Sequence, residues 1–433
     1  MTERLGRLTV PAIVVLALVT PALAAPPAVP NPDALPLGVS RVLWDLSVPS
    51  ASEITPAKLA LGEKLFNDVR LSTNDKVSCA TCHDPAKGFV DHKPLAEGVA
   101  APKQRTQRNS PTVTNALFNA TQFWDGRAAT LEEQAKLPIT NPIEMGQKNG
   151  EDVMRKVLAI PEYATAFREA FGREGTFEDL AAAIAAFERT QLAGNAPFDR
   201  FVTGDANAIS ASAKRGWELF NGKGRCGNCH AFSTTSPLFS DQKFHNIGIA
   251  AHKTDFIGLA RKATGIVRSG DLKQIDELAI ESDLSELGRF LVTKHSNDIG
   301  AFKTPTLRNI AVTAPYMHDG SMETLWDVMD HYNKGGVPNP NLDGGMQRLG
   351  LTEAQIDDMV AFMEALTSEP VAAFGKQEMT RQRGRKNVRP ERDTDVAMGK
   401  KGHLGDLAPD PDPAKPAAFG VLVIRGTSYE QRR

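Results

Sequence analysis

Two five-residue stretches decide the fold of this chain: CATCH at residues 79–83 and CGNCH at residues 226–230. Each has the form C-x-x-C-H, which is typical of covalent attachment of a c-type haem. In that chemistry the two thiols add to the vinyl groups of the porphyrin, and the adjoining histidine binds the iron. The residues that would hold two haem c groups are Cys79, Cys82 and His83, and Cys226, Cys229 and His230.

The chain has four cysteines, so these two motifs account for all of them. The alternatives are a zinc site built from all four thiols, a pair of disulfides, and a redox-active C-x-x-C. None of these alternatives explains why a histidine follows both pairs at once. The pattern therefore favours two covalently bound haems.

The N-terminus predicts export. Arg4 and Arg7 precede an apolar run at residues 10–19, and small residues at 22–24 offer a cleavage site. This layout indicates a secretory signal peptide over residues 1–24, cleaved near Ala24. An uncleaved membrane anchor is the alternative, but the run is shorter than the roughly 18 apolar residues of a spanning helix. Because c-type haems are attached on the exported side of the membrane, we expect a periplasmic protein without a stable membrane span.

Charge is distributed unevenly along the chain. Residues 25–375 carry 35 Lys and Arg against 43 Asp and Glu, whereas residues 376–433 carry 13 against 8. An acidic body argues against a nucleic acid as partner. The polar, basic segment at residues 371–433 has little apolar periodicity, so we expect a largely disordered C-terminal tail.

The chain between these ends uses one pattern twice. GEKLF at 62–66 precedes the first haem motif and GWELF at 216–220 precedes the second. Each half also closes with an amphipathic helical pattern, around Ile184 in the first half and around Met359 in the second.

This layout predicts a mainly α chain of two cytochrome c-like domains, each with one covalently bound haem, long loops and little β structure. We place the domains at residues 52–203 and 204–370, after an N-terminal linker at residues 25–51.

Six further stretches carry a family resemblance. They are RNSPT at 108–112, FWDGR at 123–127, NPIEMG at 141–146, FHNIG at 244–248, TPTLRN at 304–309 and APYMHDG at 314–320. In this order, and with both haem motifs, the chain resembles the bacterial di-haem cytochrome c peroxidase and MauG superfamily over roughly residues 52–367. The resemblance is to the MauG-like branch.

The resemblance implies that the first haem is the site of reaction with hydrogen peroxide, with His83 as its proximal ligand. Glu144 matches the family's distal glutamate, and Gln134 and Pro138 match the MauG pattern. Cleavage of the O–O bond needs a group that takes a proton from one oxygen and gives it to the other, which a partly buried carboxylate can do. Taken alone, Glu144 would be interpreted as an exposed or helix-capping carboxylate.

Most di-haem peroxidases carry a loop histidine that blocks the first haem until the second is reduced. This chain has only His92 in that interval, and it does not match the blocking position. We therefore expect a first haem that is five-coordinate or water-bound when oxidised, and a surface or structural role for His92.

The resemblance also assigns the second haem and the space between the haems. Tyr332 is the expected sixth ligand of the second iron, and Met329, one turn away, is the alternative. A thioether ligand raises the potential of a haem, whereas a phenolate should lower it. Trp124 matches the tryptophan between the two haems, where it would relay electrons or simply pack in a core.

A calcium ion is expected near the same place. Asn109 would supply a side-chain oxygen, and Pro305 and its neighbours would supply carbonyl oxygens.

Three functions follow from these patterns. The first is a MauG-like oxidoreductase that spreads oxidising equivalents over both haems and takes electrons from a small redox protein or a protein substrate. The second is a cytochrome c peroxidase that removes hydrogen peroxide with electrons from a small redox protein. The third is a non-catalytic electron carrier. Gly224 stands where MauG has a surface tryptophan, which argues against the MauG substrate, and a homodimer is possible because family members are often dimers.

Overall fold

The computed structural model describes residues 28–48, 50, 54–252, 255–266, 272–281 and 283–388. The expected signal peptide at 1–24, parts of the linker at 25–51, and residues 389–433 of the tail lie outside the described residues. The described residues between 28 and 386 belong to one compact unit, which contains both haem motifs.

Helices and long loops make up this unit, as the sequence predicts. The first half contains α1 (Arg41–Ser47), α2 (Pro56–Asn67), α3 (Cys79–Cys82), α4 (Leu131–Thr140), α5 (Gly150–Leu158), α6 (Pro161–Phe171), α7 (Phe177–Glu188) and α8 (Pro197–Val202). The second contains α9 (Ala211–Asn221), α10 (Phe256–Ile266), α11 (Leu272–Glu281), α12 (Phe290–Thr293), α13 (Leu325–Lys334), α14 (Glu353–Glu364) and α15 (Ala372–Val388). The strands described are β1 (Phe244–His245) and β2 (Phe302–Lys303), which pair antiparallel. Within the described ranges, no helix is both long and apolar enough to cross a membrane.

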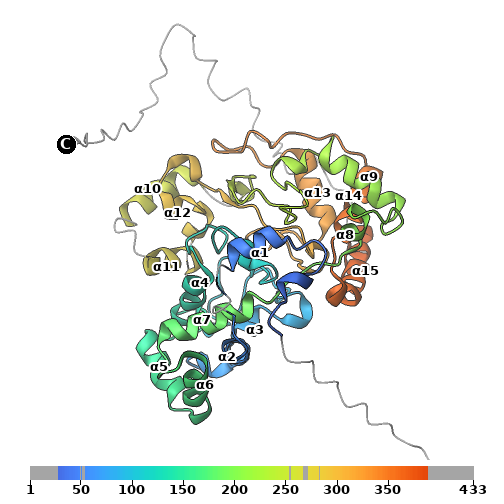
Figure 1. Ribbon diagram of the computed structural model, residues 1–433. Helices are drawn as coiled ribbons and strands as arrows, with labels where there is room; N and C mark the ends of the chain where they lie inside the picture. The colour runs from blue at the N-terminus through green and yellow to red at the C-terminus, as the bar shows by residue number, and fades with distance from the viewer. Residues whose placement is uncertain are drawn as a thin grey trace, which may run out of the picture. The chain divides into compact units, whose positions relative to one another are not determined.

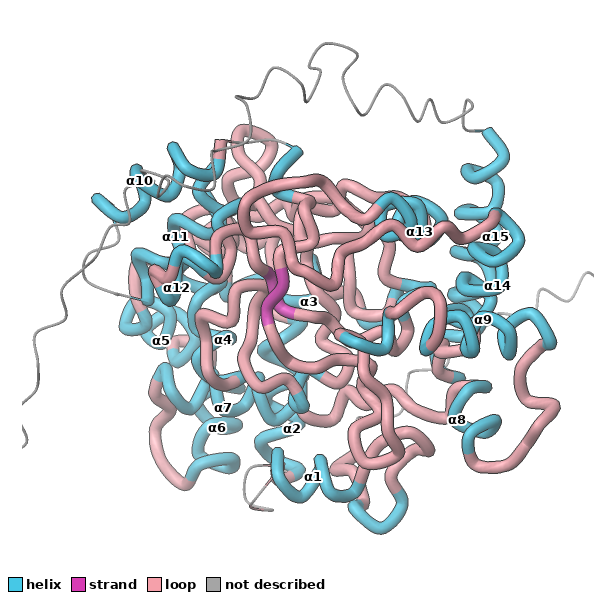
Figure 2. The backbone as a smooth tube through the Cα atoms, turned by 90° about the horizontal axis from the view of Figure 1, so that it is seen from above, coloured by secondary structure: helices cyan, strands magenta, loops and turns pink. Residues whose placement is uncertain are grey.

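The helices lie in separate groups with loops between them (Figures 1 and 2). In the first group α2 packs against α7, with α5 and α6 beside them; in the second, α9 packs against α14, with α13 beside them. Each group encloses its own cluster of buried apolar side chains. Both cores lie in the one compact unit, so the division into two cytochrome c-like domains stays a prediction.

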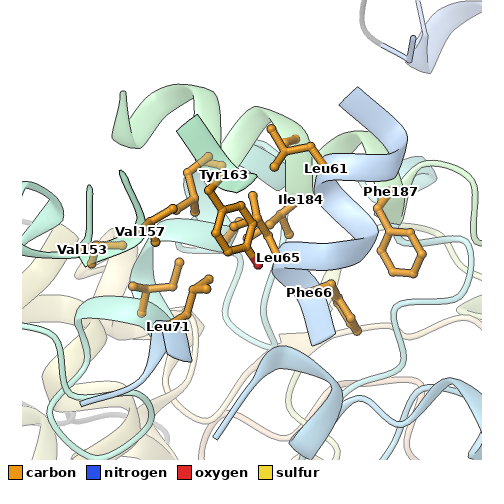
Figure 3. Packing of buried hydrophobic residues seen from close by; sticks show 14 of the residues in the cluster. Leu61, Leu65, Phe66, Leu71, Val153, Val157, Tyr163, Ile184 and Phe187 are labelled. Atoms are coloured by element: carbon orange, nitrogen blue, oxygen red, sulfur yellow. The ribbon is translucent and has the colours of Figure 1, made fainter. Parts of the chain in front are cut away.

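The first core shows how the sequence fixes its helices (Figure 3). Leu65 and Phe66 of α2 are fully buried, and the Phe187 ring of α7 packs against the Phe66 ring with centroids 5.0 Å apart and the planes tilted by 50°. Fully burying a side chain of this size stabilises a fold by about 1.5–3 kcal/mol. The helix begins at Pro56 because Thr55 caps its N-terminus, where proline is well tolerated.

Two glycines let the paired helices approach closely. A Cβ atom at Gly62 would lie 1.8 Å from the carbonyl oxygen of Ala183, and one at Gly216 would lie 2.0 Å from that of Asp358. The contact is therefore the same in both halves. A glycine of the helix before the haem motif, α2 or α9, lies against the backbone of its partner helix, α7 or α14. This explains why GEKLF and GWELF share their glycine.

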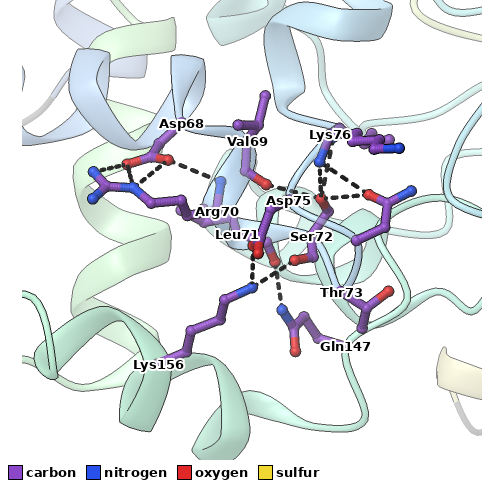
Figure 4. Close-up of polar contacts among 12 residues, drawn as sticks. Asp68, Val69, Arg70, Leu71, Ser72, Thr73, Asp75, Lys76, Gln147 and Lys156 are labelled. Carbon is purple, nitrogen blue, oxygen red and sulfur yellow. Dashed lines mark hydrogen bonds and ion pairs between the residues drawn. The ribbon is translucent and has the colours of Figure 1, made fainter.

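The loop after α2 is tied to the segment that carries Glu144 (Figure 4). Gln147 donates a hydrogen bond of 2.8 Å to the carbonyl oxygen of Leu71, and the Thr73 amide donates one of 2.9 Å to the carbonyl oxygen of Met145. Lys156 of α5 also donates to the carbonyl oxygen of Ser72, at 2.8 Å. These bonds hold the NPIEMG loop in a fixed position.

Helices α10, α11 and α12 form a third cluster of buried side chains. Asp276 of α11 anchors this cluster to the first half, because it accepts hydrogen bonds from Arg127 at 2.9 Å and from Asn141 at 2.7 Å. Arg127 and Arg108 in turn flank the fully buried Asp125. Burial alone would raise the pKa of Asp125, but the two guanidinium groups outweigh it and lower the pKa to about 2.

The expectation of a disordered tail from residue 371 is wrong for residues 372–388, which form α15. Met379 and Gln382 on this helix are fully buried. The Gln382 side chain accepts a hydrogen bond from the Leu325 amide at 2.9 Å and donates one to the Tyr316 hydroxyl at 2.9 Å. Arg383 and Lys386 also form ion pairs with Glu364 and Asp357 of α14. Because few of the residues that hold α15 to the body are apolar, the helix has no apolar periodicity to recognise in the sequence.

Candidate haem sites

The first C-x-x-C-H motif opens onto a cavity of about 150 Å³. The residues predicted for the first haem all line it: Cys79, Cys82, His83, Trp124, Gln134, Pro138 and Glu144. Gln134 and Pro138 come from α4, and Glu144 comes from the loop that follows it. The structure thus brings together one predicted set from three separate segments of the chain.

The second motif opens onto a cavity of about 250 Å³. Cys226, Cys229 and His230 line it, as do both candidate sixth ligands, Met329 and Tyr332 of α13. Trp124, Asn109 and Pro305 line both cavities, as expected for residues between two haems.

Each motif histidine is prepared to bind a metal through Nε2. His83 Nδ1 lies 3.3 Å from the carbonyl oxygen of Phe89, and His230 Nδ1 lies 2.8 Å from that of Phe239. Burial lowers the pKa of both histidines, which favours the neutral imidazole. With the proton on Nδ1 and shared with a carbonyl, the Nε2 lone pair is available, as in many metal-bound histidines.

The four thiols do not form a common zinc site or disulfides. All are free, and the two pairs line different cavities. Burial raises the pKa of Cys79 and of Cys226 to about 12, so neither side chain favours the thiolate form that zinc requires.

Helices α4 and α13 are the same element used twice. The Thr130 side chain caps α4 by accepting a hydrogen bond from the Glu133 amide, and the Thr324 side chain caps α13 by accepting one from the Asp327 amide. The first residue of both helices is leucine. Before each cap, at the same distance along the chain, an asparagine adopts a left-handed conformation: Asn115 with φ 59° and Asn309 with φ 61°. The two helices can therefore be compared position by position.

This comparison places Pro138 of the first half at the position of Tyr332 in the second, and Ala135 at the position of Met329. A proline has no group that binds iron, whereas a tyrosine does. Met329 is 3% exposed and belongs to the second apolar core, while the Tyr332 hydroxyl makes no hydrogen bond to any described residue. Burial raises the pKa of Tyr332 above its usual range, so its ionisation needs a cation in the cavity.

Three comparisons relate these sites to known proteins. A family model described as "Di-haem cytochrome c peroxidase" matches residues 56–207. The chain is 40% identical to the methylamine utilization protein MauG of Methylorubrum extorquens over 326 residues, which are 75% of this chain and 82% of that protein. It is 36% identical to the cytochrome c551 peroxidase of Pseudomonas aeruginosa over 320 residues, 73% of this chain and 80% of the relative.

The chain belongs to the di-haem cytochrome c peroxidase and MauG family. It is an oxidoreductase of the di-haem peroxidase type. A crystal structure of a MauG-like protein associated with microbial copper homeostasis has a similar fold, with a TM-score of 0.59 and 28% identity over 82% of this chain and 96% of that one. Relatives carry both the MauG and the cytochrome c peroxidase names, so the comparisons do not separate the two activities.

The residues of this family member fit a covalently attached haem in each cavity. Each cavity offers two thiols, a neutral histidine and mostly apolar walls. Lys303 also lines both cavities. Its side chain is buried and makes no ion pair with any described residue, and this burial lowers its pKa to about 8. A buried ammonium without a partner fits the carboxylate edge of a bound haem.

Trp124 is held firmly between the two cavities. Its indole Nε1 donates a hydrogen bond of 2.9 Å to the carbonyl oxygen of Asn109, and its own carbonyl accepts one of 2.7 Å from the Lys303 amide. The side-chain amide nitrogen of Asn109 donates a hydrogen bond of 2.9 Å to the carbonyl oxygen of Lys93. The calcium ion expected near Asn109 stays a prediction.

His92 does not line the first cavity. Its ring packs against Phe374 of α15, with ring centroids 5.2 Å apart. This position supports the structural role expected for it.

Sequence reasoning missed two ionisable residues in the cavities, Lys303 and Glu188. Lys303 immediately precedes the TPTLRN stretch at residues 304–309 but is not part of it. Glu188 ends α7, next to Phe187, at a position that the predicted apolar face of that helix does not include. His245, in the FHNIG stretch, lies near Cys229 between two carboxylates: as an imidazolium it donates from Nδ1 to Asp343 at 2.7 Å and from Nε2 to Asp241 at 2.9 Å. Contact with the Cys229 thiol, followed by the two carboxylates, raises the pKa of His245 to about 10; thioether formation would remove the first contribution.

Proposed function

We propose that this protein is a periplasmic di-haem oxidoreductase of the MauG type. It reacts with hydrogen peroxide at the His83 haem and shares the oxidising equivalents with a second haem bound by His230 and Tyr332. The observation that carries this proposal is the exchange of Pro138 for Tyr332 at equivalent positions of α4 and α13. One cavity is open at that position, and the other offers a phenol. When bound, the two haems supply the one-electron redox chemistry and the iron at which peroxide reacts.

The distal residues of the first cavity handle the protons of peroxide. Glu144 accepts a proton from one peroxide oxygen and returns it to the other, so that water can leave when the O–O bond breaks. The two electrons that this cleavage needs would come from the haem sites. Gln134, with an amide that both donates and accepts, orients the peroxide within hydrogen-bond reach of Glu144. Pro138 keeps the remaining space free of a competing ligand.

Trp124 connects the two sites because it lines both cavities and its backbone and indole are fixed by hydrogen bonds. Its indole can lose an electron toward one cavity and regain it from the other. Tyr332 as a phenolate stabilises the higher oxidation states of the second haem and lowers its potential. Tyr332 would thereby make the second site a poor acceptor of electrons from an ordinary cytochrome and a suitable place to store oxidising equivalents.

The remaining features belong to the same proposal. The signal peptide is cleaved near Ala24, each domain carries one haem c, and a calcium ion lies between the haems near Asn109 and Pro305. The electron source is a small redox protein or a protein substrate. Gly224, which lines the second cavity, leaves no tryptophan at the position that MauG uses toward its substrate.

A cytochrome c peroxidase is the second candidate, because Met329 also lines the second cavity, one turn from Tyr332. A thioether at that iron would raise its potential and make it an electron acceptor.

Donor kinetics test these two functions. The mature protein with two haems should react with one equivalent of peroxide without prior reduction and stay oxidised for a long time. It should then consume reduced small cytochromes or copper proteins slowly. Stopped-flow absorbance measures both steps. Rapid turnover with a reduced cytochrome that begins only after one haem has been reduced would instead establish a conventional peroxidase.

A further inference from the structure

The first cavity contains a second buried carboxyl group, that of Glu188. This residue ends α7, is 6% exposed and lines the cavity together with Cys79 and Gln134. Its Oε2 atom is buried and has no hydrogen-bond partner among the described residues. The neighbouring Arg189 does not neutralise it by an ion pair, because Arg189 pairs with Glu132 of α4 at 2.7 Å.

The second half shows that a carboxyl group is not needed at this place for folding. Gly62 contacts Ala183 and Phe187 of α7 in the same way that Gly216 contacts Asp358 and Phe362 of α14. The residue after each phenylalanine therefore occupies an equivalent position, although the caps of the two helices differ by one residue. That residue is Glu188 in the first cavity and Met363, 5% exposed, in the second.

The surroundings of Glu188 favour the protonated acid. Burial raises its pKa, Arg189 lowers it and Glu132 raises it, which leaves the pKa at about 8. The faces of α2 and α5 that pack toward α7 bury only apolar side chains and a glycine. Besides burial, the charges of Glu188 and Glu144 both raise the pKa of the Cys79 thiol, so the two carboxyl groups act on the same part of the cavity.

We propose that Glu188 binds one proton when the first haem gains an electron and releases it when that haem is oxidised again. The inference rests on the proposed function, because it requires a haem attached at residues 79–83. Reduction brings one electron into the cavity and the carboxylate takes one proton from solvent, so the charge of the cavity stays constant. Oxidation reverses both transfers, and a low-dielectric site favours such coupled changes over an uncompensated charge.

The sign of the effect follows from electrostatics. The additional positive charge of the oxidised haem lowers the pKa of Glu188, and reduction raises it again. Between these two pKa values the potential of the first haem falls as pH rises. For a one-electron couple linked to one proton, the limit is about 59 mV for each tenfold change in proton activity.

The test is the midpoint potential of the first haem against pH, across neutral and alkaline pH, in the mature protein with both haems. We expect the potential of the unchanged protein to fall with pH, and that of Glu188→Gln to be nearly independent of pH. Glu188→Met, which introduces the side chain that the second half uses, should behave like Glu188→Gln. The control Met363→Leu should keep the slope, and a redox difference infrared spectrum should lose a protonated-carboxyl signal only in the Glu188 variants.

The inference would be overturned if the potential of the first haem still fell with pH in both Glu188 variants, or if it did not depend on pH in the unchanged protein. The proposed function would stand in either case, provided that the protein carries two haems per chain. Haem content distinguishes the two failures. Fewer than two covalent haems per chain would contradict the proposed function and the inference with it.

Discussion

Replacing Tyr332 with methionine is expected to raise the midpoint potential of the second haem by on the order of a few tenths of a volt. Axial ligands tune haem potentials over roughly 0.8 V, and a neutral thioether stabilises the reduced iron that an anionic phenolate disfavours. The side chain of residue 332 lines the cavity of His230, so the substitution changes the ligand without changing the helix. Spectroelectrochemical titration measures the shift.

The same variant should lose the long-lived oxidised state after peroxide and gain turnover with a reduced cytochrome. Met329→Leu is its matched control, because it removes the other candidate ligand from the same face of α13. We expect Met329→Leu to leave the potential of the second haem almost unchanged. A large shift in Met329→Leu together with none in Tyr332→Met would assign the sixth ligand to Met329 and favour the cytochrome c peroxidase function.

Replacing Glu144 with glutamine should slow the reaction of the oxidised protein with peroxide by about 10²–10⁴-fold, the usual contribution of general acid–base catalysis. Glutamine keeps the shape of the side chain but cannot carry the proton between the peroxide oxygens. The second-order rate constant from stopped-flow mixing measures the loss, and the potentials of both haems should change little.

Glu151→Gln is the control for this substitution, since Glu151 is an exposed carboxylate in the first turn of α5, away from the cavity. It should react with peroxide like the unchanged protein. If Glu144→Gln also reacted at that rate, Glu144 would have no part in proton transfer, and another group in the cavity would have to perform it.

The haem positions could be predicted because the chemistry needs particular residues at short spacings. Cys79, Cys82 and His83 are close in sequence, so their meaning does not depend on the fold. The placement of Trp124 and Glu144 beside them came from the family resemblance, since residues so far apart in the chain have no spacing rule. In the structure, Trp124 and Glu144 line the same cavity as His83.

Other features could not be predicted because they depend on which side chains a neighbouring helix presents. Glu188 ends a helix whose apolar face is clear, but its burial follows from the close approach that Gly62 permits. Gln382 is buried because the Leu325 amide and the Tyr316 hydroxyl lie opposite it. Polar residues of this kind look solvated in a sequence, which is why α15 was predicted to be disordered.

The correspondence of Pro138 and Tyr332 was open to the sequence but was not recognised from it. The helices α4 and α13 share little sequence beyond their caps and first leucine, but the segments before them share PT-x-x-N at 111–115 and 305–309 and a DG pair at the same distance from each cap. The structure shows that these segments also share a backbone conformation, because Asn115 and Asn309 are both left-handed.

In the proposed function, Pro138 would leave the first haem iron open in the oxidised protein, while His230 and Tyr332 would both bind the second. Electron paramagnetic resonance of the fully oxidised protein, recorded before any peroxide or reductant is added, distinguishes these two states of iron. We expect one high-spin ferric haem and one low-spin ferric haem in equal amounts. Two low-spin haems would show that the first iron also has a sixth ligand, and would rule out the proposed difference between the two sites.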